Sequence, residues 1–550
     1  MTDKSAVMSM VRGGKPVDLL SIVPFVVVAL ALLPVAVVLF SLVTPSWAVW
    51  QHLWDTLLPL LLRNTALLLV GVGIGTLVLG TALAWLVTAY DFPFKRTFEW
   101  LLVLPMAIPA YVMGFVYMAL FDFAGPLQTA MRSWGLADWI FWEIRSGWGA
   151  IVVMTLVLYP YVYLLAKAGF AEQSGSALEA ARSLGCSKTR AFFKVVLPLA
   201  RPSIVAGASL AMMEALADFA TVRYFNFPTV SDGILRVWHG MMDLNAASQL
   251  AGLLALFVLF LLLVEHRLRS RRAYHQVRGK NQGLPKTVLG GWRAWAATGL
   301  CGAVFIAAFV LPFGQLLLWG ARELGQINEA TLAVYARLAF NSLKLATIAA
   351  LLAVAVALLI ASLMRLRSGT LPRLLAKVLA TGYALPGAVI AVGILVPLSA
   401  LDRGINTLAE QWWDVSLGLI FTGSIIGLVY AYTVRFMAVA YNGVDSSLEK
   451  IPPNTTLAAR VLGAGRLRLI TQVQLPLILP GILAGAVLVF VDVMKELPIT
   501  IMLRPFGYDT LAIWVWQMAA ESLWQSVALP ALVIVLAGLI PVKLLLSQSK

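Results

Sequence analysis

Charged residues are scarce in this sequence, and so are the side chains that form disulfides. Only 12% of the 550 residues are charged, whereas soluble proteins carry about 25%. So few charges cannot cover the surface of a water-soluble globule of this length, which excludes most soluble classes. The two cysteines, Cys186 and Cys301, lie far apart and indicate no disulfide framework.

Two kinds of functional pattern are also missing. The four histidines show no spacing typical of a metal site on one helix, so we expect no permanently bound metal. No GxxxxGK[ST] phosphate-binding loop occurs, and no nucleophile constellation is evident. We therefore predict that the chain is not an enzyme and needs no cofactor of its own.

Hydrophobic residues dominate instead, at 61% of the chain. A helix needs about 20 consecutive apolar residues to cross a bilayer, and runs of this kind recur along the whole sequence. We predict an all-α polytopic membrane protein with about twelve transmembrane helices, six in each half. The expected spans are 20–43, 65–89, 100–121, 148–168, 203–222 and 249–265, followed by 296–320, 343–364, 374–398, 417–440, 478–501 and 527–547.

Lysine and arginine give the chain a net charge of +15 and gather in loops on one side. By the positive-inside rule, this asymmetry places both termini in the cytoplasm and argues against a role in binding nucleic acid. The most basic loop joins the two halves. We therefore predict a first repeat at 1–265 with core spans at 60–265, a basic cytoplasmic linker at 266–294, and a second repeat at 295–550 with core spans at 337–547.

A polar passage between apolar runs occurs twice. Leu178–Gly185 is followed by Leu197-Pro198, and Leu457–Gly463 is followed by Leu475-Pro476. Equivalent positions in the two copies are 278 residues apart. Because each half has an even number of expected spans, we predict parallel repeats related by an axis along the membrane normal, with a pathway between them.

The pattern of this passage resembles the EAA loop of ABC-importer permeases. In that family the loop forms short cytoplasmic helices that dock on the ATPase subunit. The resemblance implies docking on two ATP-binding subunits, which use ATP and magnesium, through Glu179, Ala180, Ala181, Gly185, Ala458, Ala459 and Gly463. It also implies a periplasmic binding protein that delivers the cargo, and a multi-pass location in a bacterial inner membrane. Leu457 stands where the first copy has Glu179, so we do not expect equivalent docking sites.

The whole chain is similar to the fused permeases of bacterial ferric-iron importers, which have two tandem six-helix repeats of the type I importer. The supporting passages are Ala217–Phe225, Lys495–Thr500 and Leu503–Ala512. The resemblance implies ferric iron as the cargo and alternating access as the mechanism. Permeases for thiamine, phosphonate and polyamines have a similar design, and these cargoes stay open as alternatives.

Four acids fall within predicted spans. Glu214 and Asp218 lie in the fifth span, and Asp492 and Glu496 lie in the eleventh, again 278 residues apart. The i,i+4 spacing places each pair on one helix face, and a charge at the bilayer centre costs about 2.5 kcal/mol or more. Because hard cations prefer oxygen ligands, we expect these acids to line the ion path and to bind ferric iron transiently.

The acids also allow other interpretations. They could pair with Lys495, Arg223 or Arg504, or lie at the outer membrane edge against the binding protein. In a secondary transporter they would be proton or sodium sites. Pro109 and Pro386 interrupt the third and ninth predicted spans, and such breaks kink a helix and often line a cavity.

Overall fold

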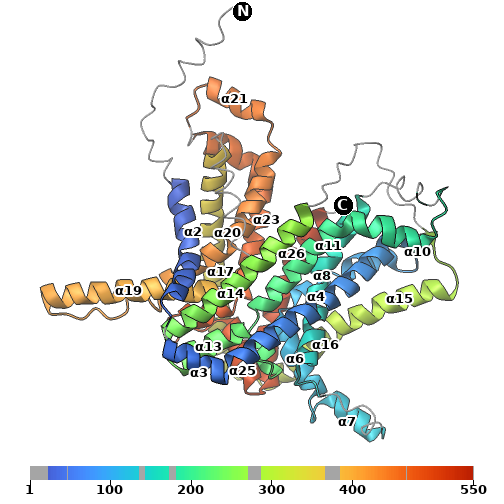
Figure 1. Cartoon of the computed structure of the whole chain (residues 1–550), viewed down its shortest axis with the longest axis horizontal. Helices are drawn as coiled ribbons and strands as arrows, with labels where there is room; N and C mark the ends of the chain where they lie inside the picture. The colour runs from blue at the N-terminus through green and yellow to red at the C-terminus, as the bar shows by residue number, and fades with distance from the viewer. Residues whose placement is uncertain are drawn as a thin grey trace, which may run out of the picture.

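Long apolar α-helices make up nearly all of the molecule (Figure 1). The computed structural model describes residues 23–45, 47–135, 143–172, 181, 183–270, 287–365, 385–465 and 468–548. Twelve helices in this part of the chain are long and apolar enough to cross a membrane, six in each half. The predicted all-α polytopic class is therefore confirmed.

The first half contains α2 (Val23–Phe40), η2 (Ser41–Val43), α3 (Trp47–Thr56), α4 (Leu58–Ala89), β1 (Tyr90–Asp91), α5 (Lys95–Leu101), η3 (Leu104–Ala107), α6 (Ala110–Phe121), α7 (Pro126–Ser133), α8 (Gly147–Ala171), α10 (Lys188–Ala191), η4 (Phe192–Val196), α11 (Leu197–Ala217), α12 (Ala220–Tyr224), α13 (Val230–Gly240) and α14 (Leu244–Ser270). The second half contains β2 (Thr287–Val288), α15 (Trp292–Phe305), η5 (Ile306–Val310), α16 (Leu311–Leu324), α17 (Glu329–Arg365), α19 (Gly387–Trp413), α20 (Ile425–Glu449), α21 (Pro453–Val461), η7 (Leu469–Gln474), α23 (Leu475–Met494), α24 (Pro498–Leu503), α25 (Leu511–Ala520) and α26 (Trp524–Gln548).

Helices dominate because a backbone in lipid must satisfy its polar groups internally. The exception among the described residues is a two-residue parallel pair, in which Tyr90 lies opposite Thr287 and Asp91 opposite Val288. This pair ties the start of the second half to the end of α4. Helix α14 continues to Ser270 and α15 begins at Trp292, so both ends of the predicted linker are helical, while 271–286 lie outside the described residues.

The predicted third span, 100–121, is not one helix. The chain there passes through α5 and η3 before Pro109, and α6 begins directly after that proline. In the second half, α19 likewise begins directly after Pro386. Because proline has no backbone N–H and fixes its own φ, it is suited to precede or open a helix. The two prolines thus start membrane helices at matching places in the two halves.

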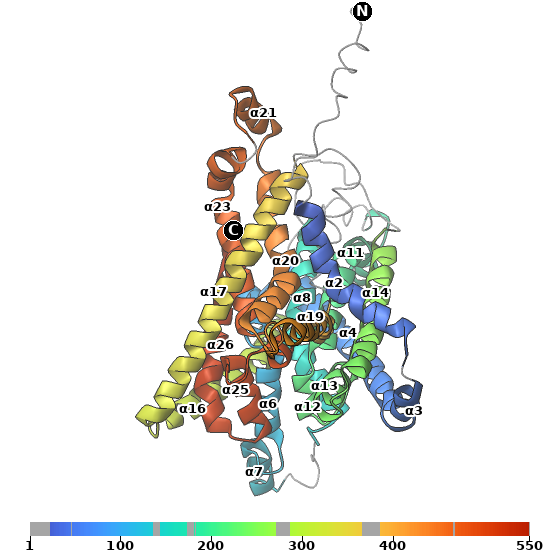
Figure 2. The same cartoon turned by 90° about the vertical axis from the view of Figure 1, so that its left-hand side faces the viewer.

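The first membrane helix of each half packs against the other half. Helix α2 lies between α14 of its own half and α19 of the second half. In the same way, α16 lies between α26 of its own half and α6 of the first half. Figure 2 shows α2 beside α14 at the right of the bundle and α16 beside α25 and α26 at the left. The two halves are therefore interlocked rather than stacked side by side.

Candidate functional site

A cavity between the two halves collects all four predicted acids. It is bounded by α6, α8 and α11 of the first half and by α20, α23 and α24 of the second. Glu214, Asp218, Asp492 and Glu496 all line this space, which we call the acid cavity. The fold therefore brings the acids of the two repeats together, although they are far apart in the chain.

The acids do not lie on continuous helix faces, so that part of the prediction was wrong. Helix α11 ends at Ala217 and α23 ends at Met494, so Asp218 and Glu496 lie just beyond helix ends. Asp218 accepts bonds from the Thr221 N–H and hydroxyl, both at 2.7 Å. Glu496 accepts a 3.2 Å bond from the Ile499 N–H. Each carboxylate bonds to the backbone three residues ahead, which offers the chain an alternative to helix continuation.

Two bases in the same cavity balance the acids of the second half. Arg435 Nη1 lies 2.8 Å from Glu496 Oε1, and both side chains are almost fully buried. Lys495 Nζ lies 2.8 Å from Asp492 Oδ1. Lys495 was among the predicted ion-pair partners. Arg435 was not predicted, although an arginine within the apolar run of α20 is itself a signal of function, since such charges are rare inside membranes.

The other two predicted cationic partners lie elsewhere. Arg504 pairs with Asp509 in the loop after α24. The guanidinium of Arg223 lies 5.7 Å from the ring centre of Trp516. Neither arginine lines the acid cavity; both line a second cavity described below.

The acid cavity is not a metal cage. Within the described part of the chain, no group of three or more histidine, cysteine, aspartate or glutamate side chains is arranged to hold a metal ion. The buried Tyr111 hydroxyl, which sequence reasoning missed, lines the cavity without a hydrogen-bond partner among the described residues. Tyr224 does not line this cavity; its hydroxyl donates a 3.2 Å bond to the Trp516 carbonyl.

The repeated polar passage ends in the same turn in both copies. Gly185 has φ +83° and Gly463 has φ +81°, a conformation that glycine adopts at little cost and that commonly ends a helix. The Cys186 N–H bonds to the Ala181 carbonyl and the Ala464 N–H to the Ala459 carbonyl, each at 3.0 Å. We call these two segments, 181–186 and 459–464, the repeated turns.

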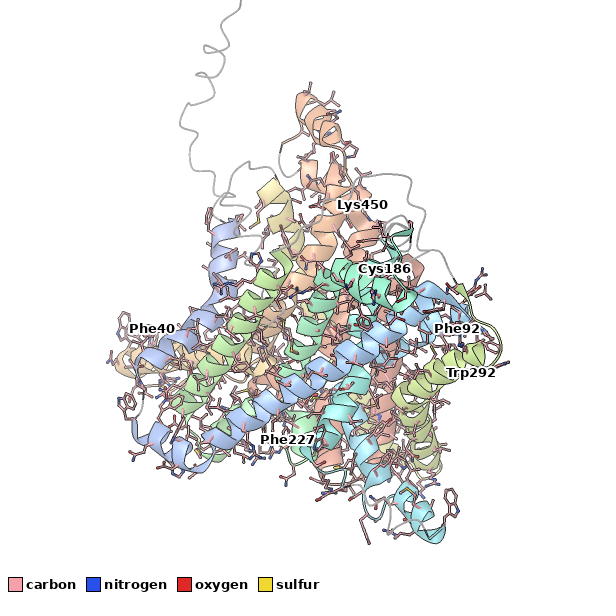
Figure 3. All side chains as sticks on the ribbon, turned by 45° about the vertical axis from the view of Figure 1, so that its right-hand side comes forward. Phe40, Phe92, Cys186, Phe227, Trp292 and Lys450 are labelled. Carbon is pink, nitrogen blue, oxygen red and sulfur yellow. The ribbon has the colours of Figure 1, made fainter. Side chains whose placement is uncertain are left out.

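Both repeated turns lie at one end of the molecule. Figure 3 shows Cys186 and Lys450 towards that end and Phe227 towards the other, and α21 protrudes there in Figures 1 and 2. We refer to this end as the turn side and to the opposite end as the far side.

Each repeated turn presents an apolar side chain to solvent. Leu184 and Leu462 occupy matching positions directly before the glycines, and each is 85% exposed. Of the predicted docking residues, Ala181 is buried, Ala459 is half-buried and Ala458 is exposed. Glu179 and Ala180 lie outside the described residues, and so does the Leu457 side chain. The two leucines were not predicted, yet their shared offset of 278 could have identified them.

A short π-helix follows each repeated turn. It spans Phe192–Val196 in the first copy and Leu469–Gln474 in the second, and each leads directly into the helix that ends at the acids. In a π-helix each hydrogen bond spans five residues instead of four, and such segments occur often at functional sites. In the first half a continuous helical segment therefore runs from Lys188, just after the turn, to the acid cavity, and in the second half such a segment runs there from residue 468.

Comparison with known proteins agrees with this twofold construction. The family described as "Binding-protein-dependent transport system inner membrane component" matches residues 76–264 and again 353–547. A Haemophilus influenzae protein named "Fe(3+)-transport system permease protein FbpB 2" is 27% identical, covering 88% of this chain and 89% of its own length. The sulfate transport system permease CysT of Escherichia coli is 28% identical and covers 44% of this chain and 87% of its own. The molybdenum transport system permease ModB of the same species is 27% identical over 27% of this chain and 64% of its own length.

Two copies of one family domain thus occupy most of the sequence, and the chain belongs to the inner-membrane permease components of binding-protein-dependent ABC importers.

Proposed function

We propose that this permease imports ferric iron, that its turn side faces the cytoplasm, and that two ATP-binding subunits dock on the repeated turns. ATP and magnesium would be used by those subunits. A periplasmic binding protein would deliver the cargo to the far side. The similarity to an Fe(3+)-named permease over 88% of the chain supports the cargo, and the gathering of lysine and arginine in the loops of one side supports the orientation.

The repeated turns are well placed to be moved by a bound partner. Leu184 and Leu462 are exposed, apolar and placed alike in both halves, so each of the two subunits would have one exposed leucine to contact, although the residues around the two leucines differ. When ATP binding draws the two subunits together, the turns move with them. Helices α11 and α23 then transmit this motion to their far ends, where the acids lie. Access to the acid cavity would alternate between the two sides.

The charge of the acid cavity favours a cation. Four carboxylates and two bases line it, which leaves a formal charge of −2 when all six groups are ionised. Carboxylate oxygens are the ligands that hard metal ions prefer. Because no described cluster is arranged as a cage, the acids would attract a passing ion rather than retain it. The single observation that carries this proposal is the meeting of all four acids in one cavity between the halves.

The test is uptake of labelled ferric iron by the complete importer in proteoliposomes. The double variant Glu214→Gln with Asp218→Asn removes two charges but keeps the side-chain shapes and the oxygen that accepts from Thr221. We expect uptake to fall at least tenfold while the ATP-binding subunits still co-purify. Glu410→Gln, an exposed acid of α19 outside the cavity, is the matched control. Normal iron uptake by the double variant would refute the assigned path.

A further inference from the structure

A second cavity lies between the halves on the far side of the molecule. Its walls come from α12, α13 and the start of α14 in the first half and from α19, α24 and α25 in the second. Figure 1 places α13 and α25 at the end opposite α10 and α21. The charged or titratable residues that line it are Arg223, Arg236, His239 and Arg504. We call it the arginine cavity.

No aspartate or glutamate is among the described residues that line this cavity. Two of its arginines form ion pairs with carboxylates that do not line the cavity. The fully buried Asp232 pairs with Arg236 at 2.5 Å, and Asp509 pairs with Arg504. Burial raises the pKa of the Asp232 carboxyl, and the charge of Arg236 opposes that rise. These pairs fix the positions of two guanidinium groups on opposite walls.

The third arginine differs from the other two. Arg223 is exposed, and within the described residues no carboxylate forms an ion pair with it. Its guanidinium instead rests over the Trp516 ring, 5.7 Å from the ring centre. Such stacking fixes the plane of the guanidinium while leaving its N–H groups to bond elsewhere. Arg223 belongs to the first half and Trp516 to the second, so the contact bridges the cavity walls.

We propose that the arginine cavity is an anion site and that it takes an oxyanion or a carboxylate-bearing ligand. Guanidinium groups bind such ligands through paired, charge-assisted hydrogen bonds, and three of them face one space here. The inference rests on the proposed function because it specifies the form of the cargo. A bare trivalent cation would be repelled by these arginines. Iron would therefore enter bound to an anion.

The two cavities are linked by short helices. Helix α12 begins two residues after Asp218 and carries Arg223 in its last turn, and α24 lies between Glu496 and Arg504. Cargo that enters from the far side would meet the arginines first and the acids second. An anionic metal complex would thus place its anion against the arginines while its metal faces the acids. This order gives the protein a means to strip the anion from the metal.

The test is equilibrium binding to the full-length chain in lipid nanodiscs, without ATP-binding subunits. The probes are sulfate, inorganic phosphate, citrate and ferric citrate, each titrated calorimetrically. We expect saturable binding of at least one probe. Arg223→Gln should weaken this binding at least tenfold, and Arg223→Lys should weaken it less because it keeps the charge.

Arg132→Gln is the matched control, because Arg132 also stacks on an aromatic ring but does not line the cavity. Gln517→Glu adds a carboxylate to the same wall and should also weaken binding at least tenfold, independently of how the Arg223 variants fold.

The outcomes separate the sources of the anion. Binding of sulfate, phosphate or citrate without iron would identify a site for the anion alone. Binding of ferric citrate only would identify a site for the metal complex. Absence of saturable binding for every probe, or equal affinity in wild type, Arg223→Gln and Gln517→Glu, would overturn the proposal. Because the assay needs no transport, intact anion binding combined with failed iron uptake would reject the iron cargo and leave the anion site standing.

Discussion

Among single residues, Gly387 shows how closely the acid cavity is packed. It begins α19, directly after Pro386. A Cβ atom at this position would meet Arg435 Nη1 and would lie 2.6 Å from Glu496 Oε1. A glycine is therefore required for the buried ion pair to approach the helix start. The first half has Ala110 at the matching place and no arginine that needs the room.

The first prediction concerns this close approach. We expect Gly387→Ala to lower the free energy of unfolding by about 1–3 kcal/mol, because overpacking forces neighbouring groups to shift. Gly404→Ala is the matched control on the same helix, since nothing lies within 4 Å of its added Cβ and alanine favours helix. Thermal unfolding in detergent measures both. Equal melting temperatures for the two variants would contradict the packing argument.

The second prediction concerns the ion pair itself. Removing one partner of a buried pair leaves an uncompensated charge and costs about 3–5 kcal/mol, so we expect that loss for Arg435→Met. The matched control is Lys167→Met, which breaks the half-exposed pair with Glu99 and should cost about 1 kcal/mol or less. Combining Arg435→Met with Glu496→Gln should restore part of the stability. A double variant less stable than the sum of the single effects would argue against a paired charge.

Among structural elements, the repeated turns and the helices that follow them are the parts suited to coupling. Each turn ends with a left-handed glycine, exposes one leucine and leads through a π-helix into a membrane helix. Neither leucine is packed within the described chain, because each is 85% exposed. Their apolar surface is therefore available to a partner.

The third prediction tests this availability. We expect Leu184→Ser with Leu462→Ser to change the stability of the isolated chain by no more than about 0.5 kcal/mol, as is usual for surface positions. Co-purification with the ATP-binding subunits should fall markedly. Leu401→Ser, an exposed leucine of α19, is the control and should leave assembly intact. Full assembly of the doubly substituted permease would exclude the leucines from the docking surface.

The sequence was a good guide to the elements but not to their ends. Apolar runs located all twelve spans, since length and hydropathy alone decide whether a helix can cross a bilayer. Asp218 and Glu496 were expected inside helices, because apolar periodicity continues past both residues. Their carboxylates instead bond to backbone N–H groups three residues ahead. These bonds compete with continuation of the helix, and a hydropathy pattern does not reveal them.

The candidate site was predicted in part for a similar reason. The offset of 278 linked the acids of the two halves, and the structure places all four in one cavity. Arg435 and Tyr111 have no counterpart at the matching positions of the other half, so the repeat could not identify them. Tertiary packing alone brings them to the cavity.

In the whole molecule, two tyrosines form hydrogen bonds between the interlocked halves. Tyr430 donates a 2.7 Å bond to the Leu30 carbonyl of α2, which lacks its usual helical donor because Pro34 has no N–H. Tyr117 donates a 2.6 Å bond to the Ala307 carbonyl of η5. In that π-helix the bonding partner of Ala307 would be Pro312, which also has no N–H. Each half thus donates a hydrogen bond to a carbonyl of the other half that a proline has left without its helical donor.

The fourth prediction follows from these two contacts. Tyr117→Phe and Tyr430→Phe should each lower stability by about 0.5–1.5 kcal/mol, the usual net value of a hydrogen bond. The tyrosines lie on α6 and α20, with no shared partner, so the two losses should add. Unfolding of the single and double variants in detergent measures this. A double variant as stable as the wild type would mean that these bonds do not hold the halves together.

The charges in the acid cavity are distributed unequally between its walls. Arg435 and Lys495 neutralise acids of the second half, whereas the positions 278 residues earlier in the first half hold Val157 and Ala217. A permease assembled from two identical subunits must repeat every charge on both walls, and no electric field can then cross its axis. Fusion into one chain removes that constraint. The proposed ion path would therefore be unequally charged across its width, and a cation in it would be drawn towards one wall.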